Sequence, residues 1–270
     1  MNEKQLLAND VSEFLAQVMK FTTQWFSSEQ GWGPWFRGHS DASWNLTPTL
    51  YRDAPPTRGI RKVEDEIRQE FIIRAPSLSA ERPQNSWDWY FLMQHSGAPT
   101  RLLDWTEGAL MALYFAVRNK SDKSDAAVWV LNPWALNTSV IGVDEVIAPS
   151  AEAGLFELDT ERYARWLPAR YQASIELEVK LPVAIYPTHF ARRISSQRSC
   201  FTIHGSVRDG FEELSGEARS GLVKILIPGS AAREIDRSLS VAGIDEITIC
   251  PDLDGLGRWL TGVLRDESRG

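Results

Sequence analysis

Hydrophobic residues recur along the chain at two spacings, which predict helices and strands respectively. Between residues 12 and 26 the apolar positions follow a helical period, so we expect an amphipathic helix packed on the body of the fold. Nearly every residue from 108 to 117 is apolar, which indicates a helix buried on most sides. Short apolar runs predict strands at 35–36, 126–131, 183–187, 201–204, 223–227 and 247–249.

Three further segments have a helical pattern, and together with the strands they define a fold class. These segments lie at 58–74, 87–93 and 231–242, and a last helix runs to Leu264. We therefore predict an α+β fold with mixed or antiparallel sheets flanked by helices. Residues 1–30 are expected to form an N-terminal helix packed on the core. Residues 31–270 are expected to form a single domain with an irregular insertion at about 137–173.

Composition narrows the class of protein. Hydrophobic residues make up 43% of the 270 positions, which is enough for a sizeable core. The net charge of −7 argues against nucleic acid wrapping the whole surface. Neither a signal peptide nor an apolar run of membrane-spanning length is found, and the two cysteines have no metal-ligand spacing. We expect a cytoplasmic protein that does not associate with membranes.

The polar stretch from Gln94 to Thr106 carries the most side chains able to do chemistry. We expect a loop that brings His95, Thr100, Arg101 and Asp104 to the start of the buried helix. Asp104 and Glu107 have the spacing of a capping box. Arg and Asp are rarely buried unless paired. The pair is thus either a structural ion pair that locks the loop or part of a functional site.

A second candidate is Arg37, which stands at a strand end beside Gly38. A planar guanidinium in this position is suited to bind a phosphate or carboxylate bidentately. The alternative is that Arg37 pairs with a carboxylate of the same fold, such as Asp104. The alternating segment from Trp44 to Arg52 is expected to line the same cavity wall, with Arg52 either a second anion contact or simply exposed.

Several other residues allow two interpretations. Glu66 and Glu70 have metal-ligand spacing, but the many charges around them favour a solvated helix face. His204 is either a functional or a satisfied core histidine. Asp252 and Asp254 have the chemistry of cation ligands, but a helix cap is favoured for Asp252. We predict no dedicated metal site.

The motifs together resemble the FRG domain family, which is named after a Phe-Arg-Gly motif. Phe36-Arg37-Gly38 supplies that motif, and the central one reads Gln94-His95-x-Gly97-x-Pro99-Thr100-Arg101-Leu102-Leu103-Asp104-Trp105-Thr106. A third motif runs from Arg193 to His204, with Ser199 where the family usually has Gly. The closing motif is Pro251-Asp252-Leu253-Asp254-Gly255. The resemblance therefore runs from Trp35 to Leu256.

The order of these motifs is similar to that of the Arg–Ser–Glu type of ADP-ribosyltransferase. This similarity implies a split β-core and NAD as the cofactor, with Arg37 on its phosphates or nicotinamide ribose. Residues 104–106 would replace the Ser-Thr-Ser turn, and Gln197 would lie near the catalytic Glu. Because Gln is neutral, Asp104 or another carboxylate must supply the missing charge, or the protein binds a nucleotide without transferring it.

The resemblance implies two overlapping sets of site residues. The catalytic set is Arg37, His95, Arg101, Asp104 and Gln197. The cofactor-binding set is Arg37, Gly38, His39, Thr100, Arg101, Trp105, Thr106 and Phe201.

Three hypotheses for function follow. The first is an NAD- or nucleotide-handling enzyme of ADP-ribosyltransferase type, acting as a toxin or phage-defence effector on a protein or nucleic-acid acceptor. In it, Arg37 and Arg101 bind the pyrophosphate and tryptophans stack on the bases. The second is a metal-dependent nucleotide or nucleic-acid hydrolase. It would use His95 or His204 as base, with Asp104, Asp252 and Asp254 on the metal. The third is a non-catalytic module that senses a ligand or binds a partner, whose motif residues form a buried polar network.

Overall fold

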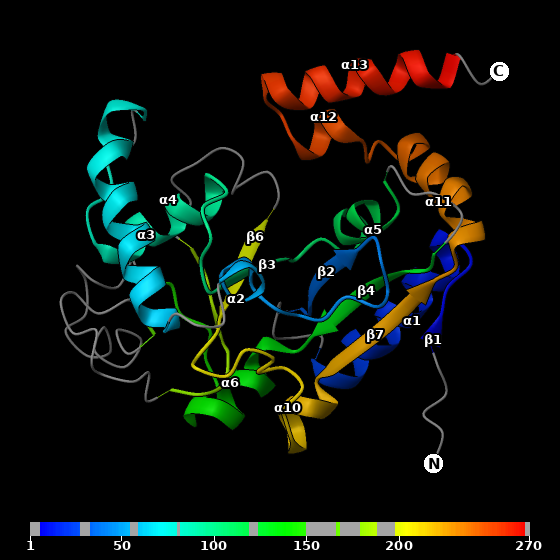
Figure 1. The fold of residues 1–270 in the computed structure, drawn as a ribbon. Coiled ribbons are helices and arrows are strands. Elements are labelled where there is room, and N and C mark those ends of the chain that lie inside the picture. Colours follow the sequence, from blue (N-terminus) through cyan, green and yellow to red (C-terminus); the bar gives the residue numbers. More distant parts are fainter. Residues whose placement is uncertain are drawn as a thin grey trace.

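The computed structural model describes residues 6–27, 33–54, 59–79, 82–118, 124–149, 166–167, 179–187 and 198–267. One seven-stranded sheet runs through these residues, with helices around it (Figure 1). The strand order is β1-β7-β4-β2-β3-β6-β5, and only β1 and β7 pair in parallel. The α+β prediction is confirmed. The strands are β1 (Leu6–Leu7), β2 (Trp35–His39), β3 (Leu102–Thr106), β4 (Ala126–Leu131), β5 (Val183–Ile185), β6 (Ser199–Ile203) and β7 (Leu222–Ile227).

The helices lie in groups along this sheet. The buried helix α5 (Ala109–Val117) packs with α1 (Val11–Trp25) and α11 (Gly229–Val241) around β2, β4 and β7. At the other end, α4 (Ser86–His95) packs on β3, β5 and β6 beside α3 (Ile60–Arg74). The remaining helices are α2 (Thr49–Asp53), η1 (Ala75–Ser77), α6 (Pro133–Ile141), α10 (Gly216–Ser220), α12 (Glu246–Ile249) and α13 (Leu253–Glu267). In the described part of the chain, none of the helices combines the length and apolarity that crossing a membrane requires.

The sheet is almost divided between β2 and β3. These strands pair at a single position, Phe36 opposite Thr106. By contrast, β2 pairs with β4 at five positions, and β3 pairs with β6 at five. Past Phe36, the main-chain groups that face the gap need other hydrogen-bond partners or solvent. The break therefore creates an opening in the middle of the sheet.

The structure corrects three local predictions. Residues 102–106 form strand β3, so Asp104 does not cap α5, whose N-cap is Gly108. Pairing with β6, about 100 residues later, outweighs the local capping pattern. Residues 247–249 belong to helix α12, closed by a capping box between Asp245 and Thr248. A segment of three residues is too short to reveal a period. Finally, α6 continues to Ile141, so the first part of the expected irregular insertion is helical.

Candidate functional site

A cavity of about 640 Å³ opens where β2 and β3 part. Both strands line it, together with the end of α4 and one face of α5. Motifs that are far apart in sequence, from residues 36–44 and 94–106, thus face one space. We call this cavity the cleft.

Arg37 is the central charged group of the cleft. Its side chain is 20% exposed, and Nη1 donates a hydrogen bond to the main-chain oxygen of Asp104 at 2.6 Å. This bond satisfies a carbonyl that the interrupted β2–β3 ladder leaves free. Nε donates to Nε2 of His39 at 3.1 Å. Nη2 has no hydrogen-bond partner among the described residues, so it is available to a ligand.

Asp104 brings a carboxylate to the same space. Its side chain is 57% exposed and lies 3.8 Å from Nη1 of Arg37. The amide of Gln94 donates to Oδ2 of Asp104 at 2.9 Å, and the hydroxyl of Thr100 donates to Oε1 of Gln94. Thr100 therefore fixes the orientation of Gln94, which in turn positions the carboxylate. Burial lowers the pKa of Arg37 and the charge of Asp104 opposes this effect, so the guanidinium stays protonated.

A second guanidinium in the cleft belongs to Arg118, which sequence reasoning did not identify. It follows the last residue of α5, and its Nη1 donates to Oε2 of Glu246 at 3.3 Å. Its guanidinium also lies over the ring of Phe115, 4.7 Å from the centroid. The sequence did offer one signal for it, because Arg118 directly follows the apolar segment that predicts the buried helix.

Arg101, by contrast, does not reach the cleft, which corrects the expectation that it binds pyrophosphate. Its side chain is fully buried, and Nε donates to both carboxylate oxygens of Glu64 at 2.8 and 3.0 Å. Its two terminal nitrogens donate to the main-chain oxygens of His204 and Trp166. Burial lowers the pKa of Arg101, but the charges of Glu64, Tyr90 and Tyr51 and the hydrogen bond to Glu64 together outweigh this effect, so its pKa is above the usual value. The Arg101 side chain therefore has a structural role, because it connects Glu64, Trp166 and His204 inside the core.

Comparison with known proteins bears on the residues that build the cleft. Residues 33–125 match the family model of the FRG domain. The chain contains an FRG domain. The match covers the Phe-Arg-Gly motif and the central motif, while the third and closing motifs lie beyond it. No curated protein matches the chain, and no solved structure does either.

Two histidines of the FRG domain differ in their surroundings. His95, at the end of α4, lines the cleft and is partly exposed. His39 is buried beside it, with its ring at 6.0 Å from that of the half-exposed Trp44. Burial, and then the charge of Arg37, lowers the pKa of His39 to about 3. His39 is therefore neutral at physiological pH, with Nε2 accepting from Arg37 and the proton on Nδ1.

Gly38 lines the cleft and is also needed for packing, while its contact with a cofactor stays a prediction. A Cβ at this position would lie 2.0 Å from the main-chain oxygen of Ala112 and 2.7 Å from the nitrogen of Ala116. The glycine therefore lets α5 lie directly against β2. This contact in turn sets the position of Arg37 next to it.

The other candidate residues are divided between the cleft and the core. Trp105 and Thr106 line the cleft, although the indole of Trp105 is buried and its Nε1 donates to Thr202 at 3.0 Å. Phe201 lies in the core, where its ring stacks on Phe91 at 5.5 Å, so the expected cofactor contact is wrong. Gln197 falls outside the described residues.

Of the residues proposed for a metal-dependent hydrolase, His204 and Asp252 have other roles in the fold, and the side chain of Asp254 lies outside the described part of the structure. His204 is buried, and Nε2 makes a hydrogen bond of 3.2 Å with the oxygen of Leu46. Asp252 caps α13 by accepting from the nitrogen of Gly255 at 2.7 Å, as predicted. Within the described ranges, no group of three or more His, Cys, Asp or Glu could hold a metal ion.

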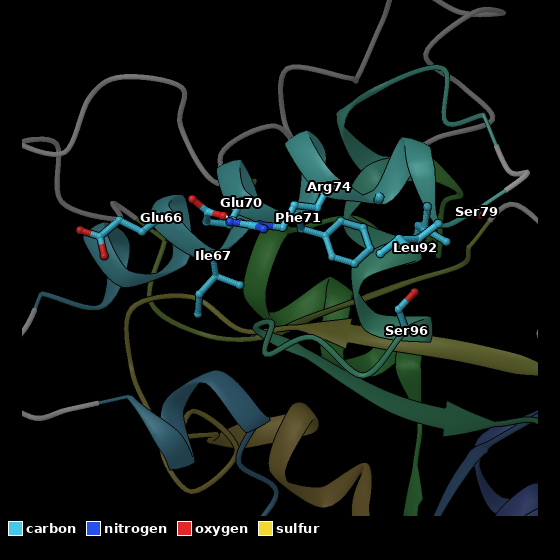
Figure 2. A pocket seen from close by; sticks show the side chains of 10 residues that line it. Glu66, Ile67, Glu70, Phe71, Arg74, Ser79, Leu92 and Ser96 are labelled. Atoms are coloured by element: carbon cyan, nitrogen blue, oxygen red, sulfur yellow. Dashed lines mark hydrogen bonds and ion pairs between the residues drawn. The ribbon is translucent and has the colours of Figure 1, made fainter.

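A second cavity, of about 600 Å³, lies between α3, η1 and α4 and is mainly apolar (Figure 2). Phe71 and Leu92 line it, and so do Glu66 and Glu70, whose side chains are exposed to solvent. Their exposure confirms the predicted solvated face. None of the predicted catalytic or cofactor-binding residues that the structure describes lines this cavity, so we place the candidate site in the cleft.

Proposed function

We propose that the cleft binds the phosphate-bearing part of a nucleotide, with NAD as the specific candidate, and that the protein is an enzyme of ADP-ribosyltransferase type. The observation that carries this proposal is Arg37, a largely buried cation at the cleft whose Nη2 has no hydrogen-bond partner among the described residues. Anions are bound most strongly by guanidinium groups that are already fixed by other hydrogen bonds.

The size and lining of the cleft support a dinucleotide. Its volume of about 640 Å³ falls within the range of small-molecule sites. Arg37 and Arg118 supply two positive charges for a pyrophosphate, with Arg118 in the role expected of Arg101. The half-exposed ring of Trp44 and the ring of Phe115 offer faces for a base.

Asp104 supplies the charge that the neutral Gln197 lacks. In the proposed reaction the bond between C1′ of the ribose and the nicotinamide nitrogen breaks, and nicotinamide leaves with the electron pair. Positive charge then develops at C1′, where the carboxylate of Asp104 stabilises it. A hydroxyl, amine or water of the acceptor forms the new bond to C1′ and releases its proton to solvent. Gln94 and Thr100 hold the carboxylate in place throughout.

Binding is tested by calorimetric titration of NAD into wild type and Arg37→Ala. We expect the substitution to weaken binding by about 30-fold or more, since a charge-assisted contact is lost. Arg237→Ala is the control, because that side chain is 69% exposed on α11 and paired with Glu234. Circular dichroism should show that both variants are folded. Unchanged affinity in Arg37→Ala contradicts the proposal.

The role of Asp104 is tested by Asp104→Asn, with release of nicotinamide as the measured activity. We expect turnover to fall by about 100-fold or more, because charge stabilisation is lost while the shape is kept. NAD affinity should not fall, because the substitution keeps the shape of the side chain and removes a negative charge near the phosphates. A variant with full activity would remove Asp104 from this role.

NAD consumption is the activity that a toxin or phage-defence effector of this type requires. Expression of the wild-type protein in a bacterial cell should then lower the cellular NAD pool, and expression of Arg37→Ala should not. Equal NAD levels in the two cultures argue against this biological role.

A further inference from the structure

A polar pocket of about 500 Å³ adjoins the cleft. The loop from Ser43 to Thr47, helix α2 and the segment at 208–209 form its walls. Trp44 lines both this pocket and the cleft, and half of its surface is exposed. The indole ring is therefore the wall that the two spaces share.

Two arginines give this pocket its charge. Arg52 and Arg208 are both exposed, and neither forms an ion pair with another described residue. Nη2 of Arg52 donates to the hydroxyl of Thr49 at 2.9 Å, and this is its single hydrogen bond within the described ranges. The pocket also contains Asp209, whose Oδ1 accepts from the hydroxyl of Thr47 at 2.7 Å. One carboxylate thus faces two guanidinium groups, and a net positive charge remains.

This charge is continuous with that of the cleft. After burial and Asp104, the positive charge of Arg52 is the third influence on the pKa of Arg37, which it lowers. The two guanidinium groups are thus close enough to repel each other. In a chain whose net charge is −7, such a grouping of cations around one tryptophan indicates an anionic ligand that spans both spaces.

We infer that the Arg52–Arg208 pocket binds a second phosphate group of the nucleotide, on the far side of a base that stacks on Trp44. This inference rests on the proposed function for the first phosphate site. Guanidinium forks match phosphate oxygens, and an indole face between two phosphate sites selects a planar base. The ligand class is a nucleotide with separated phosphates. Its source is either a dinucleotide carrying a 2′-phosphate, such as NADP, or a short single strand.

The experiment compares the affinities of NAD, NADP and a thymidine tetranucleotide for the full chain at low salt. For wild type we expect NADP to bind about tenfold tighter than NAD, since one further charge-assisted contact forms. Arg208→Ala, and separately Arg52→Ala, should reduce this ratio to about one, because each removes a second-phosphate contact. Arg237→Ala, on α11, should keep the wild-type ratio.

The other outcomes distinguish the sources and the two proposals. If NAD and NADP bind equally but the tetranucleotide binds in an Arg208-dependent manner, the second phosphate belongs to a strand. If NAD does not bind at all while Arg208-dependent binding of the tetranucleotide persists, the proposed function fails and the second phosphate site stands. If no ligand of the three shows binding that depends on Arg52 or Arg208, the inference is overturned.

Discussion

Arg37 and Arg101 belong to neighbouring motifs of the same FRG domain, yet one lies at an open cleft and the other is sealed in the core. Each has a carboxylate near it, Asp104 for Arg37 and Glu64 for Arg101. Each arginine also lies near a buried histidine, His39 for Arg37 and His204 for Arg101. Burial and the positive charge of the arginine lower the pKa of that histidine to about 3. The two sites differ in how completely the guanidinium is satisfied.

The Arg101 site is complete. Its guanidinium donates to Glu64 and to two main-chain oxygens, so none of its three nitrogens lacks a partner. A buried charge requires this, because an unpaired ion in the interior costs several kcal/mol. At the Arg37 site, Nη2 has no partner among the described residues, which is tolerated because the side chain is 20% exposed at the cleft. A guanidinium with all donors engaged stabilises the fold, and one with a spare donor is available for binding.

Removal of the buried counter-charge should have the largest effect. Glu64→Gln leaves Arg101 charged and without its carboxylate, so we expect the free energy of unfolding to fall by about 3–5 kcal/mol. Urea denaturation measures this. Glu70→Gln is the matched control on the same helix, in an exposed pair with Arg74, and should leave the denaturation midpoint unchanged. A loss below about 1 kcal/mol for Glu64→Gln would show that the two arginine sites are energetically alike.

Acid should destabilise both sites through His39 and His204. Burial lowers both pKa values to about 3 in the folded protein, whereas a histidine in the unfolded chain has a pKa of about 6.5. Below about pH 6.5 the unfolded state therefore binds more protons than the folded state. Stability is therefore lost as the pH falls from about 6.5 towards 3. Between pH 6.5 and 5 each histidine should contribute a loss of about 1.5 kcal/mol, measured by urea denaturation at each pH.

Glutamine substitutions separate the two contributions to this pH dependence. His39→Gln and His204→Gln should each remove about half of the slope above pH 5, where few carboxylates titrate. A slope that survives both substitutions would mean that other groups cause it.

A methyl group at Gly38 should disturb both the packing of α5 and the cleft. Gly38→Ala places Cβ against the main-chain oxygen of Ala112, so α5 must move and we expect a loss of about 1–3 kcal/mol. Because Arg37 is adjacent, NAD binding should also weaken. Gly33→Ala is the control, since a Cβ there meets no atom within 4 Å. Wild-type stability and binding in Gly38→Ala would contradict the close contact.

Loss of Arg37 itself should change stability least. Arg37→Gln removes hydrogen bonds to Asp104 and His39 at a partly exposed position, so we expect a loss of about 1 kcal/mol in urea denaturation. This small effect, next to that of Glu64→Gln, would confirm that the two arginines have different roles. A loss as large as that of Glu64→Gln would mean that Arg37, like Arg101, mainly stabilises the fold.

Much of the secondary structure follows from local pattern. The apolar runs ending at Val117 and at Leu131 led to a correct helix and strand, because elements buried on most sides are apolar throughout. Asp252 was correctly favoured as a helix cap because its partner is only three residues away. The alternative in which Arg37 pairs with Asp104 is also present in the structure, as a contact of 3.8 Å.

The tertiary structure alone decided which arginine faces the cleft. Glu64 lies 37 residues before Arg101, and the two carbonyls that complete its shell lie 65 and 103 residues after it. Asp104 became a strand residue rather than a cap because β6 pairs with it from about 100 residues away. Local sequence specifies which backbone shape a segment prefers, but the partners of a charged side chain depend on which distant segments the packed core brings beside it.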